Sequence, residues 1–416
     1  METIQKKATG KYFVFILLYL GWCISYIDRA AINISLAAIG KEFLMSPSTM
    51  GIVLSSFFVG YALMQLPGGW LADKFGSKKI IIAGILFWSI FTGITGFAWS
   101  FASLIAIRFL FGIGEGAFPP ASLKGIAENF SKEDRPKMTS ALLSSNYIGS
   151  AIAPMVIAPL LMFLGWRHMF GVIGALGVIF IIVYWFGVRE TRPSEAGETK
   201  AKVQKVPMKE LLKMPLMWKL VIAWFGLSLV NKGLDSWMPT YLLTVRHLDL
   251  KAIGLLTPLP FIAAGISTAI GGWLMVRFFD KKEKYFLIGS ASMTAVFLYF
   301  MYTAQTVGMV IFFQSIVYFF KSFVMAICMS LPMKLLPGTV SGSAAGMINL
   351  GGQSAGFVSP VIIGFMISAF NGSYDAAFFF LIGAACLTII SALTIRTDKV
   401  VAVTVTEDGK LVRSSS

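Results

Sequence analysis

Long apolar runs separated by short polar stretches dominate the pattern of this chain. Each run holds roughly 20 residues, which as an α-helix is enough to cross a hydrocarbon core about 30 Å thick. Because the runs and their short connections use up most of the chain, little is left for a separate soluble domain. We therefore predict an all-α membrane protein with twelve transmembrane helices, at residues 12–36, 48–72, 79–98, 102–126, 139–161, 169–188, 217–242, 252–277, 285–303, 308–331, 340–368 and 374–395.

Composition supports the membrane assignment, and charge orients the chain. Of the 416 residues, 56% are hydrophobic and 13% are charged, which is unlike a soluble domain. The net charge of +15 would suit a nucleic-acid partner, but most of the 35 Lys and Arg residues fall in predicted loops on the side of the N-terminus. Such a bias marks the cytoplasmic face of a membrane protein. We therefore expect cytoplasmic termini and no nucleic-acid partner. The exceptions, in loops on the opposite side, are Lys41, Arg167, Arg246 and Lys251.

The longest polar stretch ahead of the tail, residues 189–215, predicts a cytoplasmic linker between two halves. One motif recurs across it with an offset of 203 residues, as GGWLADKFGSKK at 68–79 and GGWLMVRFFDKK at 271–282. This repetition indicates an internal duplication. The predicted domains are an N-terminal six-helix bundle at 12–188, a C-terminal six-helix bundle at 216–395 and a cytoplasmic tail at 396–416.

The offset also pairs positions that played no part in finding it. Two parallel repeats with a binding site near the membrane midplane are typical of rocking transporters. A basic residue on the first helix of each half is therefore expected to face one shared cleft. The pairs are Arg29 with Lys232, Asn146 with Asn349, and Gly149 with Gly352.

Several ionisable side chains fall inside the predicted spans. Placing one at the bilayer centre costs about 2.5–3.5 kcal/mol on insertion scales, so such residues usually face a partner or a wet cavity and carry function. Each could instead cross-link helices, and that alternative stays open above all for Lys321 and Asp235, since Asp235 could pair with Lys232. The full set is Asp28, Arg29, Arg108, Glu115, Lys232, Asp235 and Lys321.

Helical spacing constrains where these charges point. Arg108 and Glu115 are seven residues apart, about two turns or roughly 10 Å, so both can look into one cavity. The neighbours Asp28 and Arg29 lie about 100° apart around a helix. If Arg29 faces the cleft, Asp28 points toward a neighbouring helix, where a carboxylate can exchange protons without touching substrate.

Small and polar residues interrupt two of the apolar runs. In RFLFGIGEGAFPP (108–120), the glycines allow close helix packing, and the prolines break the helix. The glycine spacing superficially resembles a dinucleotide loop, but no strand precedes it, so nucleotide binding is not predicted. In GMINLGGQSAGFVSP (346–360), the amides of Asn349 and Gln353 need partners inside a span.

Taken together, the motifs resemble the major facilitator superfamily over about residues 12–395. More narrowly, the chain resembles the anion:cation symporter family, whose bacterial members import sugar acids such as galactonate, glucarate and hexuronates with protons. The resemblance implies two pseudo-symmetric six-helix bundles and a multi-pass protein of the bacterial inner membrane. The segments that carry it are YIDR (26–29), GGWLADKFGSKK, RFLFGIGEGAFPP, GWRHMF (165–170), WMPTYL (237–242) and GMINLGGQSAGFVSP.

The resemblance also implies roles for individual residues. Arg29 would bind the substrate carboxylate, with Tyr26 and Tyr61 lining the sugar-acid site. Asp28 and Glu115 would carry protons, and Arg108 would tune Glu115. Further substrate contacts are expected from Lys232, Lys321, Asn146, Asn349 and Gln353.

The motif after the second span resembles the cytoplasmic gate of the superfamily. Asp73 would be its acid, and the alternative is a solvated loop charge that balances nearby lysines. In the second copy, Val276 and Phe279 replace Asp73 and Gly76, so only the N-terminal copy keeps the acid. The gating residues expected in this copy are Gly69, Asp73, Gly76 and Lys78.

These observations predict a secondary transporter that imports a small organic anion, a sugar acid or related carboxylate, with H⁺ by alternating access. Na⁺ is the alternative coupling ion, and a monomer is expected to be the functional form. Because Lys232, Asp235 and Lys321 depart from sugar-acid importers, an antiporter that exchanges an organophosphate for phosphate stays open. A transporter-like ligand sensor is a third possibility.

Enzyme activity is not predicted. The chain has only two histidines, His168 and His247, both in predicted loops, and no nucleophile–base pair is recognisable. All three cysteines fall in predicted helices, so the sequence indicates neither a disulfide framework nor a metal site, and no cofactor is expected.

Overall fold

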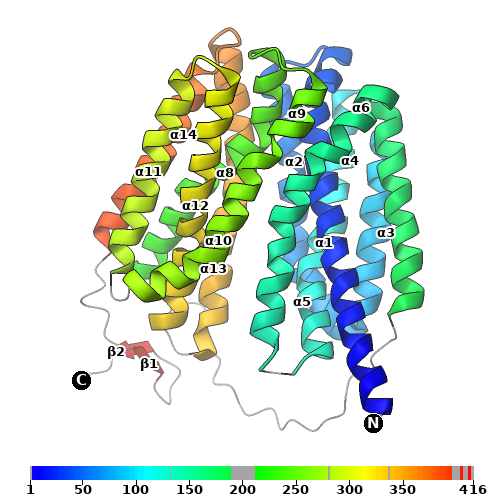
Figure 1. Ribbon diagram of the computed structural model, residues 1–416, viewed down its shortest axis with the longest axis vertical. Helices are drawn as coiled ribbons and strands as arrows, with labels where there is room; N and C mark the ends of the chain where they lie inside the picture. Colours follow the sequence, from blue (N-terminus) through cyan, green and yellow to red (C-terminus); the bar gives the residue numbers. More distant parts are fainter. Residues whose placement is uncertain are drawn as a thin grey trace. The chain divides into compact units, whose positions relative to one another are not determined.

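Helices make up nearly all of the computed structural model, which describes residues 2–131, 133–188, 211–279, 282–335, 338–395, 403–405 and 411–413. Outside the helices, β1 (Val403–Val405) and β2 (Leu411–Arg413) pair antiparallel within the predicted tail, a departure from the all-α expectation. Residues 189–210 of the predicted linker lie outside the described residues, as does the rest of the tail from residue 396. The helices (Figure 1) are α1 (Glu2–Glu42), α2 (Pro47–Phe75), α3 (Ser77–Thr95), α4 (Phe101–Gly116), α5 (Phe118–Asn129), α6 (Arg135–Gly187), α8 (Pro215–Thr244), α9 (Leu250–Leu256), α10 (Pro258–Phe278), α11 (Glu283–Thr303), α12 (Val307–Leu335), α13 (Gly338–Ala369) and α14 (Asp375–Thr394).

Each of the twelve predicted apolar segments is helical over most of its described residues. Ten stretches are long and apolar enough to cross a membrane, and one of them, Lys137–Gly187, has 51 residues. At about 1.5 Å per residue, that stretch is long enough for two crossings. It is interrupted at Gly165, whose φ of 69° suits glycine. The count of twelve crossings and the side of the termini stay predictions.

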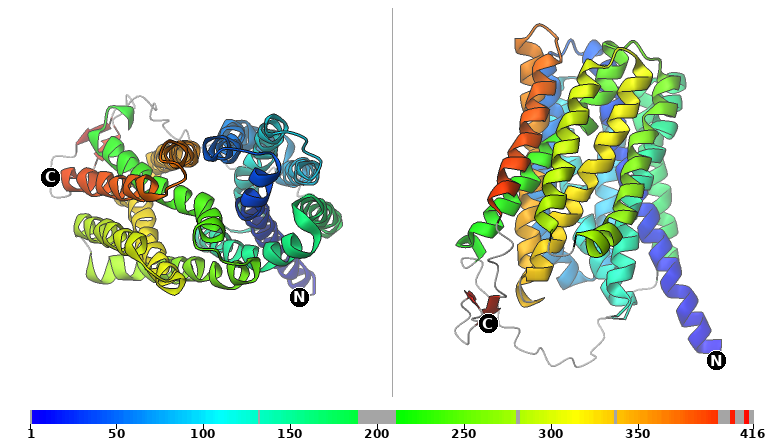
Figure 2. Two further views of the ribbon diagram at one scale, coloured as in Figure 1. Left: turned by 90° about the horizontal axis from the view of Figure 1, so that it is seen from above. Right: turned by 60° about the vertical axis from the view of Figure 1, so that its left-hand side comes forward.

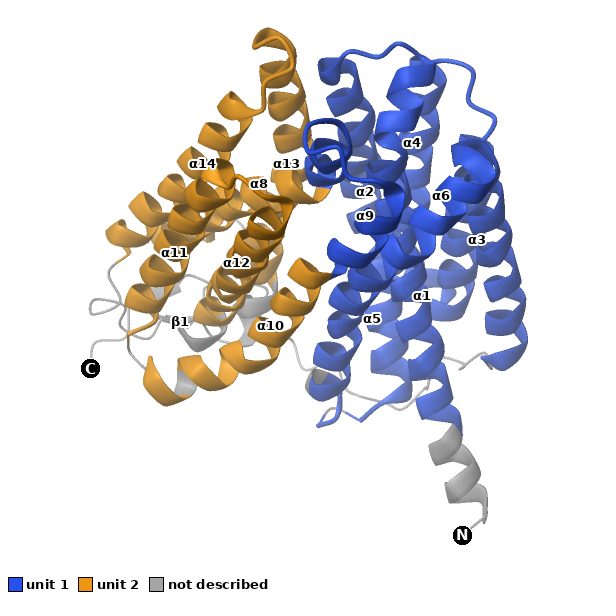
Figure 3. Cartoon of the chain, turned by 45° about the horizontal axis from the view of Figure 1, so that its top comes forward, with its two compact units in different colours: residues 1–196, 236–258 blue, residues 197–235, 259–416 orange. Residues whose placement is uncertain are grey.

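Two compact units make up the chain, residues 1–196 with 236–258, and residues 197–235 with 259–416 (Figure 3). We call them unit 1 and unit 2. The end of α8 and all of α9 belong to unit 1, although they follow the predicted linker. Close packing explains this, because a Cβ at Gly254 in α9 would lie 3.3 Å from the Pro154 carbonyl oxygen of α6.

Within each unit, long helices run side by side (Figure 2). In unit 1, α1 packs along α6 and α2 packs along α4, while α3 contacts both α4 and α6. In unit 2, α11 packs against α12 and α14. Paired repeat positions make comparable contacts. A Cβ at Gly149 would lie 3.0 Å from the Cys23 Cα of α1, and one at Gly352 would lie 2.1 Å from the Trp224 Nε1 of α8.

Glycines let α4 lie directly against the backbone of its neighbours. A Cβ at Gly112 would lie 2.2 Å from the Phe57 carbonyl oxygen of α2, and one at Gly114 would lie 2.8 Å from the Trp88 nitrogen of α3. Both distances are shorter than carbon atoms tolerate, so only small residues permit this approach. The packing places Glu115 between α1, α2 and α3.

We expect Gly112→Ala to destabilise the protein by about 1–3 kcal/mol, because the added methyl must push α2 from α4. Thermal unfolding of the detergent-purified protein measures the change. Gly171→Ala in α6 is the matched control, since a Cβ there would meet no atom within 4 Å among the described residues. Equal melting of the two variants would contradict the packing argument.

Candidate functional site

A buried ion pair joins α1 to α4 inside unit 1. The Arg29 Nε donates to the Glu115 Oε1 over 2.6 Å, and the Ser25 hydroxyl donates to the same oxygen. The Glu115 side chain is fully buried, whereas 14% of the Arg29 side chain is exposed. The predicted carboxylate ligand and one predicted proton carrier are therefore bonded to each other.

Aromatic rings surround the Arg29 guanidinium. Its Cζ lies 5.0 Å from the ring centroid of Tyr26, 5.1 Å from that of Phe57 and 4.7 Å from that of Tyr61. Each such contact is worth about 0.5–2 kcal/mol, more where water is excluded. The Arg29 Nη2 has no acceptor among the described residues. This nitrogen can therefore donate to a further anion without breaking a bond inside the protein.

Asp28 and Arg108 lie behind this pair and are almost fully buried, at 2% and 1% exposure. The Arg108 Nη2 donates to the Thr95 hydroxyl over 2.8 Å, and its Cζ stacks 4.4 Å from the Phe111 ring. Arg108 therefore bonds to α3 rather than to Glu115, although its charge still acts on Glu115 and Asp28. The Asp28 Oδ1 has no donor among the described residues.

Unit 2 holds a charged cluster of its own, formed by α8 and α12. The Lys321 ammonium donates to the Asn231 Oδ1 and lies 3.3 Å from the Tyr318 ring centroid. The Tyr318 hydroxyl donates to the Asp235 carboxylate. The charges of Asp235 and Lys232 both act on Lys321. Lys321 thus sits in a network that contains its own counter-charge.

The predicted amides have different surroundings. Asn146 in α6 and Gln353 in α13 are half-buried, and the side-chain carbonyl oxygen of each lacks a donor among the described residues. Asn349 is exposed, one helical turn from Gln353. Asn146 therefore belongs to unit 1 with Arg29, and the other two belong to unit 2.

The predicted gating residues lie around the connection between α2 and α3. Gly76 makes that connection with a φ of 88°, a conformation that favours glycine. The Asp73 carboxylate accepts from the Lys124 ammonium of α5 over 3.1 Å, and 79% of its side chain is exposed. Lys78 lies 5.5 Å from the Trp185 ring centroid. A Cβ at Gly69 would make an ordinary contact with Pro120.

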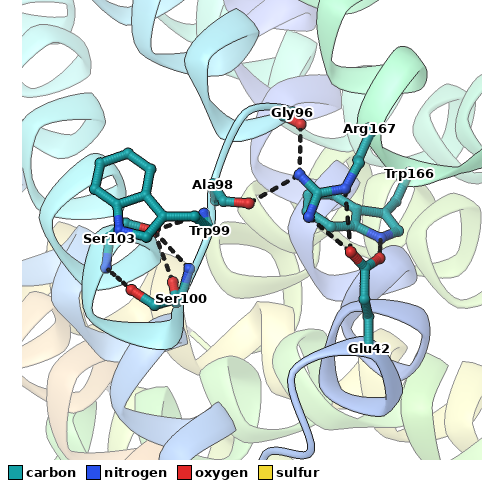
Figure 4. Close-up of polar contacts among 8 residues, drawn as sticks. All are labelled: Glu42, Gly96, Ala98, Trp99, Ser100, Ser103, Trp166 and Arg167. Carbon is teal, nitrogen blue, oxygen red and sulfur yellow. Dashed lines mark hydrogen bonds and ion pairs between the residues drawn. The ribbon is translucent and has the colours of Figure 1, made fainter.

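Two residues of the GWRHMF motif, Trp166 and Arg167, hydrogen-bond to Glu42 and so connect separate segments of unit 1 (Figure 4). We call Glu42, Trp166 and Arg167 the staple. The Arg167 Nη2 donates to the Glu42 Oε1 over 2.6 Å, and the Trp166 Nε1 donates to the Glu42 Oε2 over 2.6 Å. The Arg167 Nη1 donates to the carbonyl oxygens of Gly96 and Ala98 over 2.9 and 2.8 Å. The staple joins the end of α1, the loop between α3 and α4, and the interruption of α6. Arg167 is one of the four basic residues in predicted loops on the side of the membrane opposite the N-terminus. Its pairing with Glu42 explains why a basic residue lies there.

We expect Arg167→Ala to destabilise the protein more than Glu42→Ala, because the arginine also binds two loop carbonyls, whereas the glutamate has one further donor, the Trp166 indole. The ion pair itself should couple by about 0.5–1 kcal/mol, since both side chains are more than one-third exposed. A double-mutant cycle on thermal unfolding measures both quantities. Equal costs for the two single variants would contradict the role given to Gly96 and Ala98.

The sequence predicted the charged members of these clusters and missed their neutral partners. Ser25 and Phe57 in unit 1, like Tyr318 in unit 2, look like ordinary residues of apolar helices. Asn231 carried a signal, because an amide beside Lys232 within a span needs a partner.

Residues 18–360 match the family model of the major facilitator superfamily. The chain belongs to that superfamily. The predicted family is thus confirmed, together with a multi-pass protein of the cell membrane. In the major facilitator superfamily, the chain is 30% identical to a probable sulfoacetate transporter of Cupriavidus necator, over 90% of this chain and 91% of the relative. It is also 26% identical to a probable galactarate/D-glucarate transporter of Escherichia coli, and that match covers 95% of this chain and 96% of the relative.

Solved structures agree on the fold of this superfamily member. A crystal structure of a bacterial homologue of the human lysosomal transporter Spinster, in an inward-facing and unoccupied conformation, matches with a TM-score of 0.81. The match covers 92% of this chain and 96% of that one at 18% identity. At this identity, the likeness shows the fold alone.

Proposed function

We propose that the protein is a secondary active transporter that imports a small organic anion together with H⁺ by alternating access. The observation that carries the proposal is the Arg29–Glu115 pair. A substrate carboxylate and the Glu115 carboxylate would compete for the same guanidinium, which lies among aromatic rings with one nitrogen still available.

Competition for Arg29 couples the proton to the anion. Removing one partner of a buried ion pair typically costs about 3–5 kcal/mol. When Glu115 is protonated, Arg29 loses its counter-charge and a substrate carboxylate restores it. When Glu115 loses its proton, it reclaims Arg29 and the anion is released. Binding the anion and ionising Glu115 thus exclude each other.

The membrane potential makes the coupling necessary. Moving one negative charge inward against a negative interior costs about 2.3 kcal/mol per 100 mV. One proton cancels this cost for a monoanion, and a dianion needs two. Among the described residues of unit 1, Glu115 and Asp28 are the two buried carboxyls that can supply them.

Two of the relatives are named for dianions, whereas others are named for hexuronate and galactonate, which carry one acid group each. Sulfoacetate and galactarate, for which two of them are named, each carry two acid groups on a short carbon chain. A planar guanidinium such as that of Arg29 binds a carboxylate through two parallel hydrogen bonds. We therefore propose a short-chain dicarboxylate or sulfocarboxylate as the substrate class.

Proton movement into proteoliposomes tests the proposed function. Purified protein would receive a panel of aldonates, aldarates, hexuronates, sulfoacetate and sugar phosphates in a weakly buffered medium. Alkalinisation of the medium with an acid of the proposed class is the expected result. Phosphate-dependent exchange of a sugar phosphate, without any proton movement, would replace symport by the antiport alternative.

A further inference from the structure

Nine polar side chains of unit 1 each leave one buried atom without a hydrogen-bond partner among the described residues, and four of these atoms belong to Arg29, Ser89, Asn146 and Thr240. The other five come from α1, α3 and α4, and they are the Asp28 Oδ1, the Trp88 Nε1, the Thr92 Oγ1, the Arg108 Nε and the Glu115 Oε2. We call this set the polar cluster. Buried polar groups of folded proteins are nearly always hydrogen-bonded, to protein or to ordered water. The Trp88 indole and the Asp28 carboxylate lie close enough to act on each other, and the unpartnered atoms that remain call for a further ligand.

Helix geometry brings the cluster together. Trp88, Thr92 and Thr95 follow one another at spacings of four and three residues, so they share one face of α3. The Thr95 hydroxyl accepts from Arg108, which turns this face toward α4. The close approach of Gly114 to the Trp88 backbone places α3 beside Glu115. The charge of Asp28 acts on Arg108, and the charge of Glu115 acts on Asp28.

The chemistry of the unpartnered atoms selects the ligand. The carboxylate oxygens of Asp28 and Glu115 accept hydrogen bonds, the Trp88 and Arg108 nitrogens only donate, and the Thr92 hydroxyl does both. A metal cation cannot accept from the two nitrogens, and Arg108 would repel it. An anion would meet two carboxylates. Water satisfies both kinds of atom, since a buried water typically makes about three hydrogen bonds to such groups.

We propose that the polar cluster is a binding site for ordered water that passes protons between Asp28 and Glu115. A proton leaves the Asp28 carboxyl for a water oxygen while that water, or the next, gives one proton to the Glu115 carboxylate. The number of protons does not change. Trp88 and Thr92 hold the water and are positioning residues. This proposal rests on the proposed function, because it assumes that both carboxyls load during transport.

Other titratable groups around the path are few. On α1 the neighbours are Arg29 and Tyr26, on α4 the neighbour is Arg108, and on α2 it is Tyr61, whose ring, like that of Tyr26, stacks on Arg29. On α6, Tyr147 acts on Tyr26. The α3 face contributes Trp88, Thr92 and Thr95, which do not titrate near neutral pH. On α6, the ring centroid of Phe170 lies 5.5 Å from the Arg108 Cζ. Asp28 and Glu115 are therefore the two carboxyl groups among the five side chains of the polar cluster.

Thr92→Val and Trp88→Phe test the site, because each removes one hydrogen-bonding group and keeps most of the side-chain shape. We expect proton-driven accumulation of the substrate identified for the wild type to slow about tenfold, equal to about 1.4 kcal/mol. Counterflow exchange, in which the carrier returns loaded, should stay within about twofold, since no proton has to be exchanged. Thr92→Ser keeps the hydroxyl and should restore accumulation.

Thr294→Val is the matched control, since Thr294 is equally buried in α11 and, within the described part of the chain, its hydroxyl bonds to its own helix at the Ser290 carbonyl. It should leave both assays unchanged. Parallel loss of accumulation and counterflow in Thr92→Val would show a purely structural role and overturn the proposal, as would unchanged accumulation. Wild-type transport that requires Na⁺ would also overturn it in favour of a cation. If the wild type moves no protons with any substrate, the proposed function itself fails, and this outcome is seen before any variant is made.

A density map at about 2 Å resolution checks the ligand directly. We expect ordered water within hydrogen-bond distance of Thr92 and Asp28. Direct contact between these side chains, with no water between them, would overturn the site.

Discussion

Substitution of Arg29 with alanine is expected to abolish substrate-dependent proton uptake and to weaken substrate binding by about 100-fold or more. The estimate follows from the loss of the charged partner of a buried carboxylate, which costs about 3–5 kcal/mol, at 1.4 kcal/mol per tenfold. Arg29→Lys should recover only part of the affinity, because an ammonium cannot form two parallel bonds with a carboxylate. Substrate-induced shifts in melting temperature and uptake into proteoliposomes measure the two effects.

Arg277→Ala is the control for Arg29→Ala, since Arg277 is an exposed arginine in the last turn of α10. It should bind and transport like the wild type. Arg29→Ala protein that folds, yet still binds the substrate with unchanged affinity, would remove Arg29 from the binding site. The same variant also tests the ion pair, because Glu115 would lose its cationic partner and the melting temperature should fall.

Substitution of Glu115 with glutamine is expected to separate binding from coupling. Glutamine resembles the protonated acid in shape and in charge, so Arg29 would stay available to the anion. We therefore expect affinity at least as high as that of the wild type, counterflow within about threefold, and no accumulation driven by a proton gradient. The dependence of substrate binding on pH should also flatten, because the competing carboxylate is gone.

Glu42→Gln is the control for Glu115→Gln, since it neutralises a glutamate in the same unit that bonds to Arg167 and Trp166 rather than to Arg29. It should lower stability and leave proton-driven accumulation intact. Accumulation against a gradient by Glu115→Gln would show that Glu115 is not an essential proton carrier. The proposal would then rest on Asp28 alone.

Partner choice is the part of the site that spacing along the chain could not predict. Arg108 and Glu115 share one helix at a spacing that lets both face one cavity, yet Glu115 bonds to Arg29 of α1 and Arg108 bonds to Thr95 of α3. The spacing of two residues along a helix predicts the directions in which their side chains point. The neighbour found in that direction depends on how close two helices approach, which Gly112 and Gly114 set by the absence of a side chain.

The amino-acid sequence alone was enough for the membrane class, the helices and the positions of the buried charges. The physical reason is that apolar runs of about 20 residues and the high cost of a charge in lipid act locally, whatever the helices pack against. It was also enough for the family, through motifs such as RFLFGIGEGAFPP.

Only the tertiary structure could show the contacts between distant segments. The rings of Phe57 and Tyr61 around Arg29, the polar cluster, and the placement of α9 in unit 1 all join residues from different helices. The staple of Glu42, Trp166 and Arg167 joins segments more than 120 residues apart. Neutral residues such as Ser25 and Thr92 give no signal in an apolar run, because a serine or threonine hydroxyl can bond to its own helix. Their surroundings, rather than their identity, make them part of the site.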